Sequence, residues 1–291
     1  MNRRTMIALS VAGGASIAAA PIRPASAASR RAVGIDDSPE MKAAVAQGLA
    51  YFSNRCDTQS ALCIELEQAI ASGDLKSAQQ AYVNSRPPYE EIETLAYGFE
   101  DTDRDIDARP YAFDAGDTAS DFRGFHKIEV LLFGNQDLSD ALPYAQRLTK
   151  SVAELKGQLS ELERFDAAGQ FGGMFALTNE VAAKKVSSEE ETWSDQSLVI
   201  FKHNWIGAYS QFKPFEVLVA RSDAGKAENV RVAYTQAMEL LKPHFKSGMV
   251  AGTPYSQISM SERRTMADAS NRFRDSIAQA SGVLGMDMEI S

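Results

Sequence analysis

Apolar positions along most of the chain after residue 38 recur every three or four residues, which is the spacing of an amphipathic α-helix. The clearest stripe consists of Leu148, Val152, Leu155, Leu159 and Leu162, at successive spacings of 4, 3, 4 and 3 residues. Convincing alternation of apolar and polar residues, as expected for a strand, does not occur in the sequence. The pattern therefore predicts an all-α protein.

Helix signals predict eight or nine helices, enough for two helical bundles packed together. Ser259 followed by Glu262 is a capping-box pattern, and the helix that it begins should reach about Val283. Besides this helix and the leucine stripe, the predicted helices cover approximately residues 39–54, 60–72, 74–98 with a disturbance at Pro87-Pro88, 121–134, 172–186, 195–220 and 226–246.

Two stretches between the predicted helices read as breaks. Residues 99–120, FEDTDRDIDARPYAFDAGDTAS, are rich in Asp and turn formers and predict an irregular connection. A connection of this length in a compact domain is often functional. Residues 164–173, RFDAAGQFGG, predict a second break, and any division into two halves is expected there.

The first 27 residues have the features of an export signal. Arg3 and Arg4 precede a stretch of small apolar residues, and residues 25–27, Ala-Ser-Ala, match an A-x-A cleavage site. The paired arginines favour the twin-arginine route, while the loose match of NRRTMIALS leaves an ordinary secretory signal open. No later stretch approaches the ~18 to 20 apolar residues of a membrane span. We therefore expect a soluble periplasmic protein, made of residues 28–291.

Cleavage after residue 27 removes three basic and no acidic residues, which leaves 27 basic and 39 acidic residues and a formal charge of −12. This charge disfavours nucleic acid as a partner. It suits cations or basic partners, although it also serves solubility alone. Cys56 and Cys63 are the two cysteines. On one continuous helix their Cα atoms would be ~10 Å apart, so a disulfide requires the chain to turn near residues 57–60.

The sequence GFHKIE, residues 124–129, places His126 and Glu129 one helical turn apart. Residues at this spacing share a helix face with Cβ atoms ~5 to 6 Å apart, so both side chains can reach one metal ion. Metalloproteins built on helical bundles use such pairs. By itself the pattern also describes a packed or exposed histidine beside a solvated glutamate. His203 and His244 lie among aromatic residues, and we expect both to be packing or surface residues.

Further carboxylates occur in two other segments. Glu90 and Glu93, in RPPYEEIE, repeat the spacing of one helical turn, so a second helix can present two ligands. The triplet Glu189-Glu190-Glu191, in SSEEETWSD, precedes a predicted helix. An acidic triplet at this position is equally well described as a solvated helix start, which the helix dipole favours.

Several of these segments together resemble one known family. The runs SRPPYEEIETLAYGFEDTDRDIDAR, GFHKIE and SSEEETWSD are similar to the imelysin-like domain of EfeO and EfeM, periplasmic components of bacterial ferrous-iron uptake. The family pattern contains Tyr-Glu-x-Ile-Glu, Ile-Asp-Ala-Arg, Gly-x-His-x-x-Glu and a Glu-Glu run before an aromatic residue and Ser. These elements match residues 89–93, 106–109, 124–129 and 189–194, and the resemblance covers roughly residues 38–285.

The resemblance implies an all-α fold of two four-helix-bundle-like halves, with a metal site centred on His126 and Glu129. It implies that further carboxylates complete the site: Glu90, Glu93, one of Glu189 or Glu190, and, as a weaker candidate, Asp107. The longer EfeO-type proteins carry an additional cupredoxin-like domain for which this chain has no room. The chain therefore resembles the shorter EfeM type.

The expected ligands are carboxylates and one imidazole without thiolates, a hard donor set that suits iron and also accepts zinc, manganese or calcium. We expect a non-enzymatic, monomeric protein that captures Fe²⁺ or Fe³⁺. The resemblance implies delivery to an inner-membrane iron permease, with a haem-containing peroxidase-like partner in the periplasm.

Two other functions are alternatives to iron capture. A zinc peptidase is one, because the imelysin group was once assigned to the peptidases. Phe125 and Val130 flank the motif, so neither H-E-x-x-H nor H-x-x-E-H is present. The other is binding of an acidic polysaccharide of the alginate type, which a chain of this negative charge would repel unless a metal or a basic patch bridged the two.

Overall fold

The computed structural model describes residues 38–188 and 190–286, so the predicted export signal lies outside the described residues. Helices make up the regular structure of this part of the chain. The β-type pairing found there is an isolated bridge between Phe245 and Gly252. The prediction of an all-α fold is confirmed.

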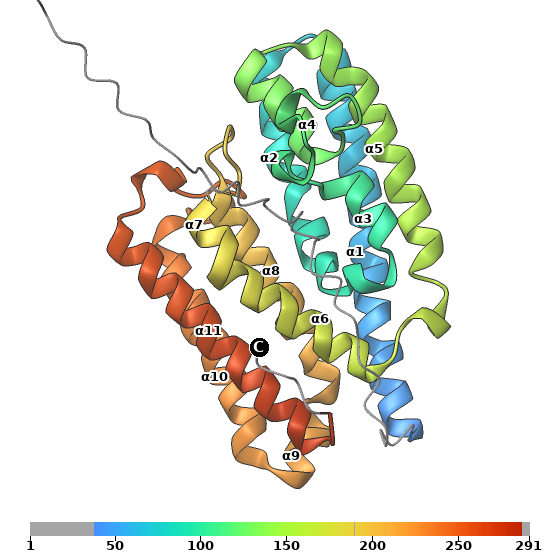
Figure 1. The fold of residues 1–291 in the computed structure, drawn as a ribbon, viewed down its shortest axis with the longest axis vertical. Coiled ribbons are helices and arrows are strands. Elements are labelled where there is room, and N and C mark those ends of the chain that lie inside the picture. The colour runs from blue at the N-terminus through green and yellow to red at the C-terminus, as the bar shows by residue number, and fades with distance from the viewer. Residues whose placement is uncertain (1–37, 189, 287–291) are drawn as a thin grey trace, which may run out of the picture.

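The first group of helices is formed by the N-terminal part of the chain (Figure 1). Long α1 packs against α2 and α5, and the short helices α3 and α4 pack along α5 and close the remaining side. The short helices α3 and α4 therefore take the place of the fourth long helix of a regular four-helix bundle. The bounds are α1 Pro39–Ala71, α2 Leu75–Ile92, α3 Glu100–Asp107, α4 Phe125–Glu129 and α5 Leu138–Gln158.

The second group is a four-helix arrangement beside the first (Figure 1). Helix α6 packs against α8 and α11, and α10 packs against α11 and α8. The two predicted bundle-like halves are thus present. The bounds are α6 Ala167–Glu180, α7 Val186–Ser188, α8 Ser197–Phe212, α9 Glu216–Ser222, α10 Ala224–Leu241 and α11 Met260–Val283.

Shorter helical turns connect these elements. Two of them, η4 Val130–Asn135 and η6 Val181–Lys185, are π-helices that continue α4 and α6 directly. The others are 3₁₀ turns: η1 Glu93–Gly98, η2 Pro110–Ala112, η3 Gly116–Thr118, η5 Leu162–Arg164, η7 Lys213–Phe215, η8 Lys242–His244 and η9 Tyr255–Gln257.

The two groups meet where α2 packs against α8. The contact is close because Gly207 has no side chain: a Cβ there would lie 2.3 Å from the backbone oxygen of Glu91. One continuous set of buried apolar side chains runs through both groups, including Phe52 of α1, Trp205 of α8 and Phe273 of α11. The halves therefore share a core.

Several predicted boundaries are wrong. Residues 39–54 and 60–72 belong to one helix, α1, because buried residues such as Cys56 and Gln59 continue its packed face through the expected interruption. The chain does not turn at residues 57–60, and Cys56 and Cys63 are buried free thiols. Helix α2 continues through Pro87-Pro88 and ends at Ile92.

The predicted breaks are also shorter than expected. Helix α3 occupies residues 100–107 of the stretch expected to be irregular, and α6 begins at Ala167, inside the predicted second break. The C-terminal prediction is confirmed, since Ser259 and Glu262 form a reciprocal capping box and the helix ends at Val283.

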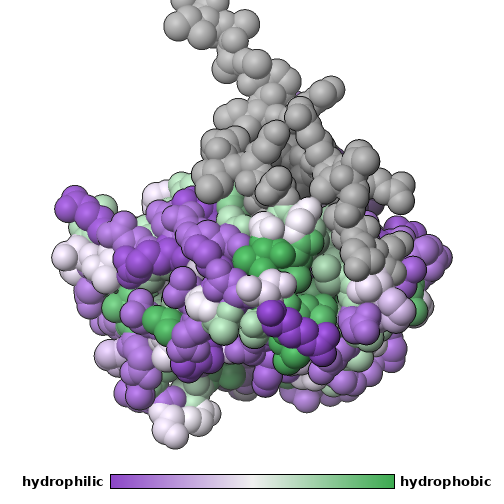
Figure 2. Space-filling view, turned by 90° about the horizontal axis from the view of Figure 1, so that it is seen from below, coloured by the Kyte–Doolittle hydropathy of each residue, from purple (hydrophilic) through white to green (hydrophobic). Residues whose placement is uncertain are grey.

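The surface at the lower end of the molecule is mostly hydrophilic, with apolar side chains gathered in the middle of that face (Figure 2). A hollow of about 390 Å³ lies between the first turns of α1 and the connection before α6, lined partly by Met41, Val45 and Phe165. Among the described residues, the helices lack the length and apolar character that crossing a membrane requires.

Candidate metal centre

Gly124 sets the position of the helix that carries GFHKIE. Its φ of +83° lies in the left-handed region, and a Cβ there would come within 2.3 Å of the backbone oxygen of Ile106. Because glycine permits this approach, the start of α4 lies against the end of α3. His126 of α4 therefore comes next to Asp107 of α3, and both side chains are buried.

Glu129 holds the His126 ring from one side. Its Oε2 atom lies 3.2 Å from Nδ1 of His126. Its Oε1 atom accepts hydrogen bonds from the backbone N–H groups of Trp193, at 2.9 Å, and Ser194, at 2.8 Å. Both carboxylate oxygens are thus engaged, and the side chain is fully buried.

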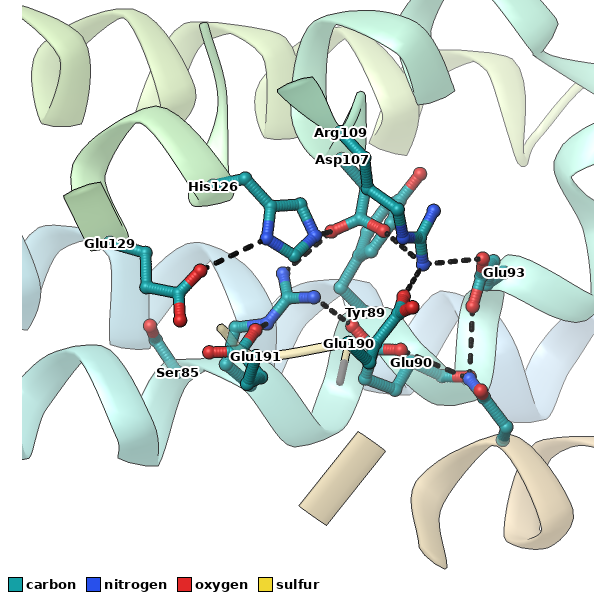
Figure 3. A network of polar contacts seen from close by, with 12 residues as sticks. Ser85, Tyr89, Glu90, Glu93, Asp107, Arg109, His126, Glu129, Glu190 and Glu191 are labelled. Carbon is teal, nitrogen blue, oxygen red and sulfur yellow. Dashed lines mark hydrogen bonds and ion pairs between the residues drawn. The ribbon is translucent and has the colours of Figure 1, made fainter. Parts of the chain in front are cut away.

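The other ring nitrogen of His126 points toward carboxylates (Figure 3). Nε2 lies 3.7 Å from Oδ1 of Asp107 and has no hydrogen-bond partner among the described residues. Asp107, His126 and Glu190 each place one potential metal ligand within 4.8 Å of the others. A second group of this kind is formed by His126, Glu129 and Glu191.

The ring of His126 is neutral at neutral pH, because burial lowers its pKa well below the usual value although Asp107 opposes this. A neutral ring has one N–H and one lone pair. When Nδ1 donates to Glu129, Nε2 presents its lone pair toward Asp107 and Glu190. Metal-binding histidines in proteins are commonly oriented by a carboxylate in this way.

Three cationic side chains lie among the carboxylates. The most central is Arg86 of α2, which is 2% exposed. It lies 2.5 Å from Glu90, 2.7 Å from Asp107 and 2.9 Å from Glu191, and each of its three guanidinium nitrogens faces a different carboxylate. Arg86 therefore links the two potential metal-binding groups.

The other two cations are Arg109 and Lys185. Nη2 of Arg109 contacts Glu190 and is 3.4 Å from Asp107 and 3.8 Å from Glu93. Nζ of Lys185 is 2.8 Å from Glu93 and 3.5 Å from Glu190. These contacts place positive charge on the same oxygens that a metal ion would use.

Carboxylates outnumber cations in the cluster. Burial alone would raise the pKa of Asp107, but the nearby Arg86 and Arg109 lower it below the usual range, so this carboxylate is ionised. Burial, together with Glu191, raises the pKa of Glu129. Fully ionised, the cluster sets six carboxylates against three cations, which would leave three negative charges unbalanced: Glu90, Glu93, Asp107, Glu129, Glu190 and Glu191 against Arg86, Arg109 and Lys185.

The peptidase M75 family model, described as imelysin, matches residues 56–280 of the chain, a span that includes the whole cluster. The chain belongs to the imelysin family. Its similarity to curated members extends over 75% of its own length.

Two kinds of relative illustrate this similarity. The iron uptake system component EfeM of Pseudomonas syringae pv. syringae is 29% identical over 219 residues, which cover 76% of EfeM. The iron uptake system components EfeO of Yersinia pseudotuberculosis and Escherichia coli K12 are 31% and 30% identical over 220 residues. The matched part spans 58% of the length of these EfeO proteins.

In this imelysin-family chain the structure brings most of the predicted site residues together. Asp107, the weaker candidate, lies 3.7 Å from Nε2 of His126. Glu90 and Glu93 belong to neither potential metal-binding group; they contact Arg86, Lys185 and the amide of Asn204 instead. Of the remaining predicted residues, His126, Glu129 and Glu190 lie in the cluster, and Glu189 lies outside the described residues.

Sequence reasoning missed Glu191 and the three cations. The solvated helix start considered for the acidic triplet does not describe Glu190 and Glu191, which are 5% and 1% exposed. Arg86 lies one helical turn before Glu90, a signal that was available in the sequence. Arg109 stands in the Ile-Asp-Ala-Arg segment, whereas nothing in the local sequence of Lys185 marked it.

The other two histidines lie outside the cluster, as expected. Nδ1 of His203 is 2.7 Å from Oε1 of Glu91, and His244 lies 3.8 Å from Glu262 at the surface of the second group.

Proposed function

We propose that this chain captures iron, as Fe²⁺ or Fe³⁺, in the periplasm and passes it to an inner-membrane permease. The observation that carries this proposal is a buried, neutral imidazole whose unpartnered Nε2 faces carboxylates, in a cluster where carboxylates outnumber cations. The names of the relatives, which are iron uptake system components, support the uptake role.

Within the proposed site, Asp107, His126 and Glu190 are the favoured ligands. Glu129 is less suited to bind metal directly because two backbone N–H groups and Nδ1 of His126 already occupy its oxygens. We infer that it orients the ring. This differs from the expectation that His126 and Glu129 bind the metal as a pair.

The donor set supports iron as cargo. Carboxylate oxygens with one imidazole nitrogen suit Fe²⁺ and Fe³⁺, and they also bind Zn²⁺ and Mn²⁺. Cys56 and Cys63 lie on α1 and belong to neither potential metal-binding group. Zinc is therefore expected to compete with iron in vitro.

Calorimetric titration of the metal-free protein tests the proposal, with Fe²⁺ under anaerobic conditions and chelated Fe³⁺ in air. Wild type should bind iron saturably, and His126→Ala should weaken binding by about 100-fold or more, since it removes a ligand and the group that organises the others. His244→Ala, which alters a histidine outside the cluster, is the matched control and should bind as wild type does. Equal binding by wild type and His126→Ala would overturn the proposal.

The family's peptidase name raises hydrolysis as another activity. Zinc peptidases of the H-E-x-x-H kind hold the metal with two histidines on one helix and leave a position for water. Here His203 and His244 each pair with a glutamate outside the cluster. We infer a binding role, and expect the zinc-loaded protein to leave casein uncleaved.

The proposed partners are the permease and a haem peroxidase-like periplasmic protein. Delivery can be tested separately from capture, by following uptake of radioactive iron in cells that carry wild type or His126→Ala. If uptake requires the chain but is the same for wild type and His126→Ala, delivery does not use this site.

A further inference from the structure

Arg109 lies where an incoming cation would bind. Its Nη2 atom contacts Oε1 of Glu190 and lies 3.4 Å from Oδ2 of Asp107. These two residues and His126 form the favoured metal-binding group. A guanidinium is permanently charged in proteins, so in the metal-free chain Arg109 places a positive charge beside two carboxylates of this group.

We propose that Arg109 is a built-in competitor for the metal: its side chain leaves Asp107 and Glu190 when the metal binds and returns when the metal departs. This inference rests on the proposed function of the site. In this role Arg109 lowers the affinity of the site for the metal, so that a site rich in carboxylates can release its cargo to a partner.

Exposure distinguishes Arg109 from the other two cations. The side chain of Arg109 is 12% exposed, whereas that of Arg86 is 2% exposed and that of Lys185 is fully buried. Arg109 is therefore the most exposed of the three cations.

A receiving carboxylate lies beside Arg109. Glu93 is already 3.8 Å from Nη2 of Arg109, and its side chain is 9% exposed. The negative charge of Glu180 also acts on Arg109 from outside the favoured group. When the guanidinium leaves Asp107 and Glu190 it can thus pair with Glu93, so its charge is not left without a partner and the cost of displacement is small.

Removal of the charge should strengthen metal binding in two ways. No cation has to be displaced, and the carboxylates of Asp107 and Glu190 repel each other more strongly until a metal arrives. The metal-free variant should therefore be less stable than metal-free wild type. Metal should stabilise the variant more, because a ligand that binds only the folded state raises stability with its affinity.

The test compares Arg109→Gln with wild type by titration with Fe²⁺ under anaerobic conditions and with Zn²⁺. The variant should bind about tenfold more tightly or better, the effect of removing one nearby like charge. Arg109→Lys keeps the charge and should remain within about threefold of wild type. Arg231→Gln removes an arginine that pairs with Glu228 at 2.8 Å on α10, in the second group, and should bind as wild type does.

A second measurement uses the wild-type chain and needs no variant to fold. Phenylglyoxal modifies accessible arginines, and mass spectrometry reports the rate for each one. Saturation with Zn²⁺ should speed modification of Arg109, because its guanidinium moves outward, and should leave the rate at Arg231 unchanged. An unchanged or slower rate at Arg109 would overturn the inference.

The outcomes separate this inference from the proposed function. If His126→Ala abolishes iron binding but folded Arg109→Gln binds no more tightly than wild type, Arg109 is not a competitor and the proposed function stands. If wild type binds neither metal but Arg109→Gln binds one of them, the competitor role holds and iron capture by the native chain fails. If neither protein binds metal, both proposals are wrong.

Discussion

Replacement of Glu129 by glutamine tests whether this side chain orients His126. Glutamine has nearly the same shape, but one of its two terminal groups is an NH₂ that can only donate hydrogen bonds. In the native chain one oxygen of Glu129 accepts from the backbone N–H groups of Trp193 and Ser194, and the other faces Nδ1 of His126. Glutamine can provide an acceptor to one side only.

Each orientation of the glutamine opposes the metal-bound state. If its oxygen faces the backbone N–H groups, its NH₂ faces Nδ1 and drives the ring proton to Nε2, where the metal would bind. If the amide is reversed, the two buried backbone donors lose their acceptor, at about 1 to 3 kcal/mol for each unsatisfied group. We expect metal affinity to fall about 10- to 100-fold, or roughly 1.4 to 2.8 kcal/mol.

Calorimetry with Zn²⁺ gives the affinities, and ¹⁵N NMR of the histidine ring gives the protonated nitrogen. In zinc-loaded wild type, Nδ1 of His126 should carry the proton and Nε2 should bind the metal. In metal-free Glu129→Gln, the proton should sit on Nε2. Because Glu129 acts through His126, the double variant with His126→Ala should bind no more weakly than His126→Ala alone.

Two results would refute this reasoning. One is zinc bound through Nδ1 of His126, the nitrogen that faces Glu129, which would restore the pair of ligands expected from GFHKIE. The other is an unchanged affinity in Glu129→Gln, which would show that the hydrogen bond to the ring does not matter for metal binding.

Three further predictions concern pH, thiols and packing. Burial raises the pKa of Glu90 to about 8 from 4.5, so the folded metal-free chain retains a proton that the unfolded chain has lost, and stability falls as pH rises toward 8. Between pH 6 and 8.5 the free energy of unfolding in urea should fall by about 2 to 3 kcal/mol less for Glu90→Gln than for wild type. The same pH dependence in both proteins would contradict this. Burial raises the pKa of both Cys56 and Cys63 to about 12, so neither should react with a disulfide reagent at pH 8 before unfolding; rapid labelling of the folded chain would show otherwise. Gly207→Ala should lower the free energy of unfolding in urea by about 1 to 3 kcal/mol, because its Cβ would meet a backbone oxygen of α2. Gly157→Ala has open space around it and should be neutral or stabilising by up to about 1 kcal/mol. Equal changes in the two variants would contradict the packing argument.

Local patterns in the sequence were enough to predict the helical class and part of the site. The stripe from Leu148 to Leu162 and the capping box at Ser259 depend on spacing within one or two helical turns, so neither needed knowledge of distant contacts. The pairing of His126 with Glu129 is equally local, because one helical turn separates them. Boundaries were less accurate where packing extended a helix, as in α1 across Cys56.

The arrangement around His126 was decided by tertiary structure. Sequence spacing showed that Glu90 and Glu93 lie one helical turn apart, but only packing determined that they meet Lys185 and Asn204 of the second group. Conversely, the close approach of α3 and α4 at Gly124 brought Asp107 to Nε2, and the segment before α8 supplied Glu190. Charges from distant parts of the chain share one buried volume, and their balance depends on distances that no local pattern contains.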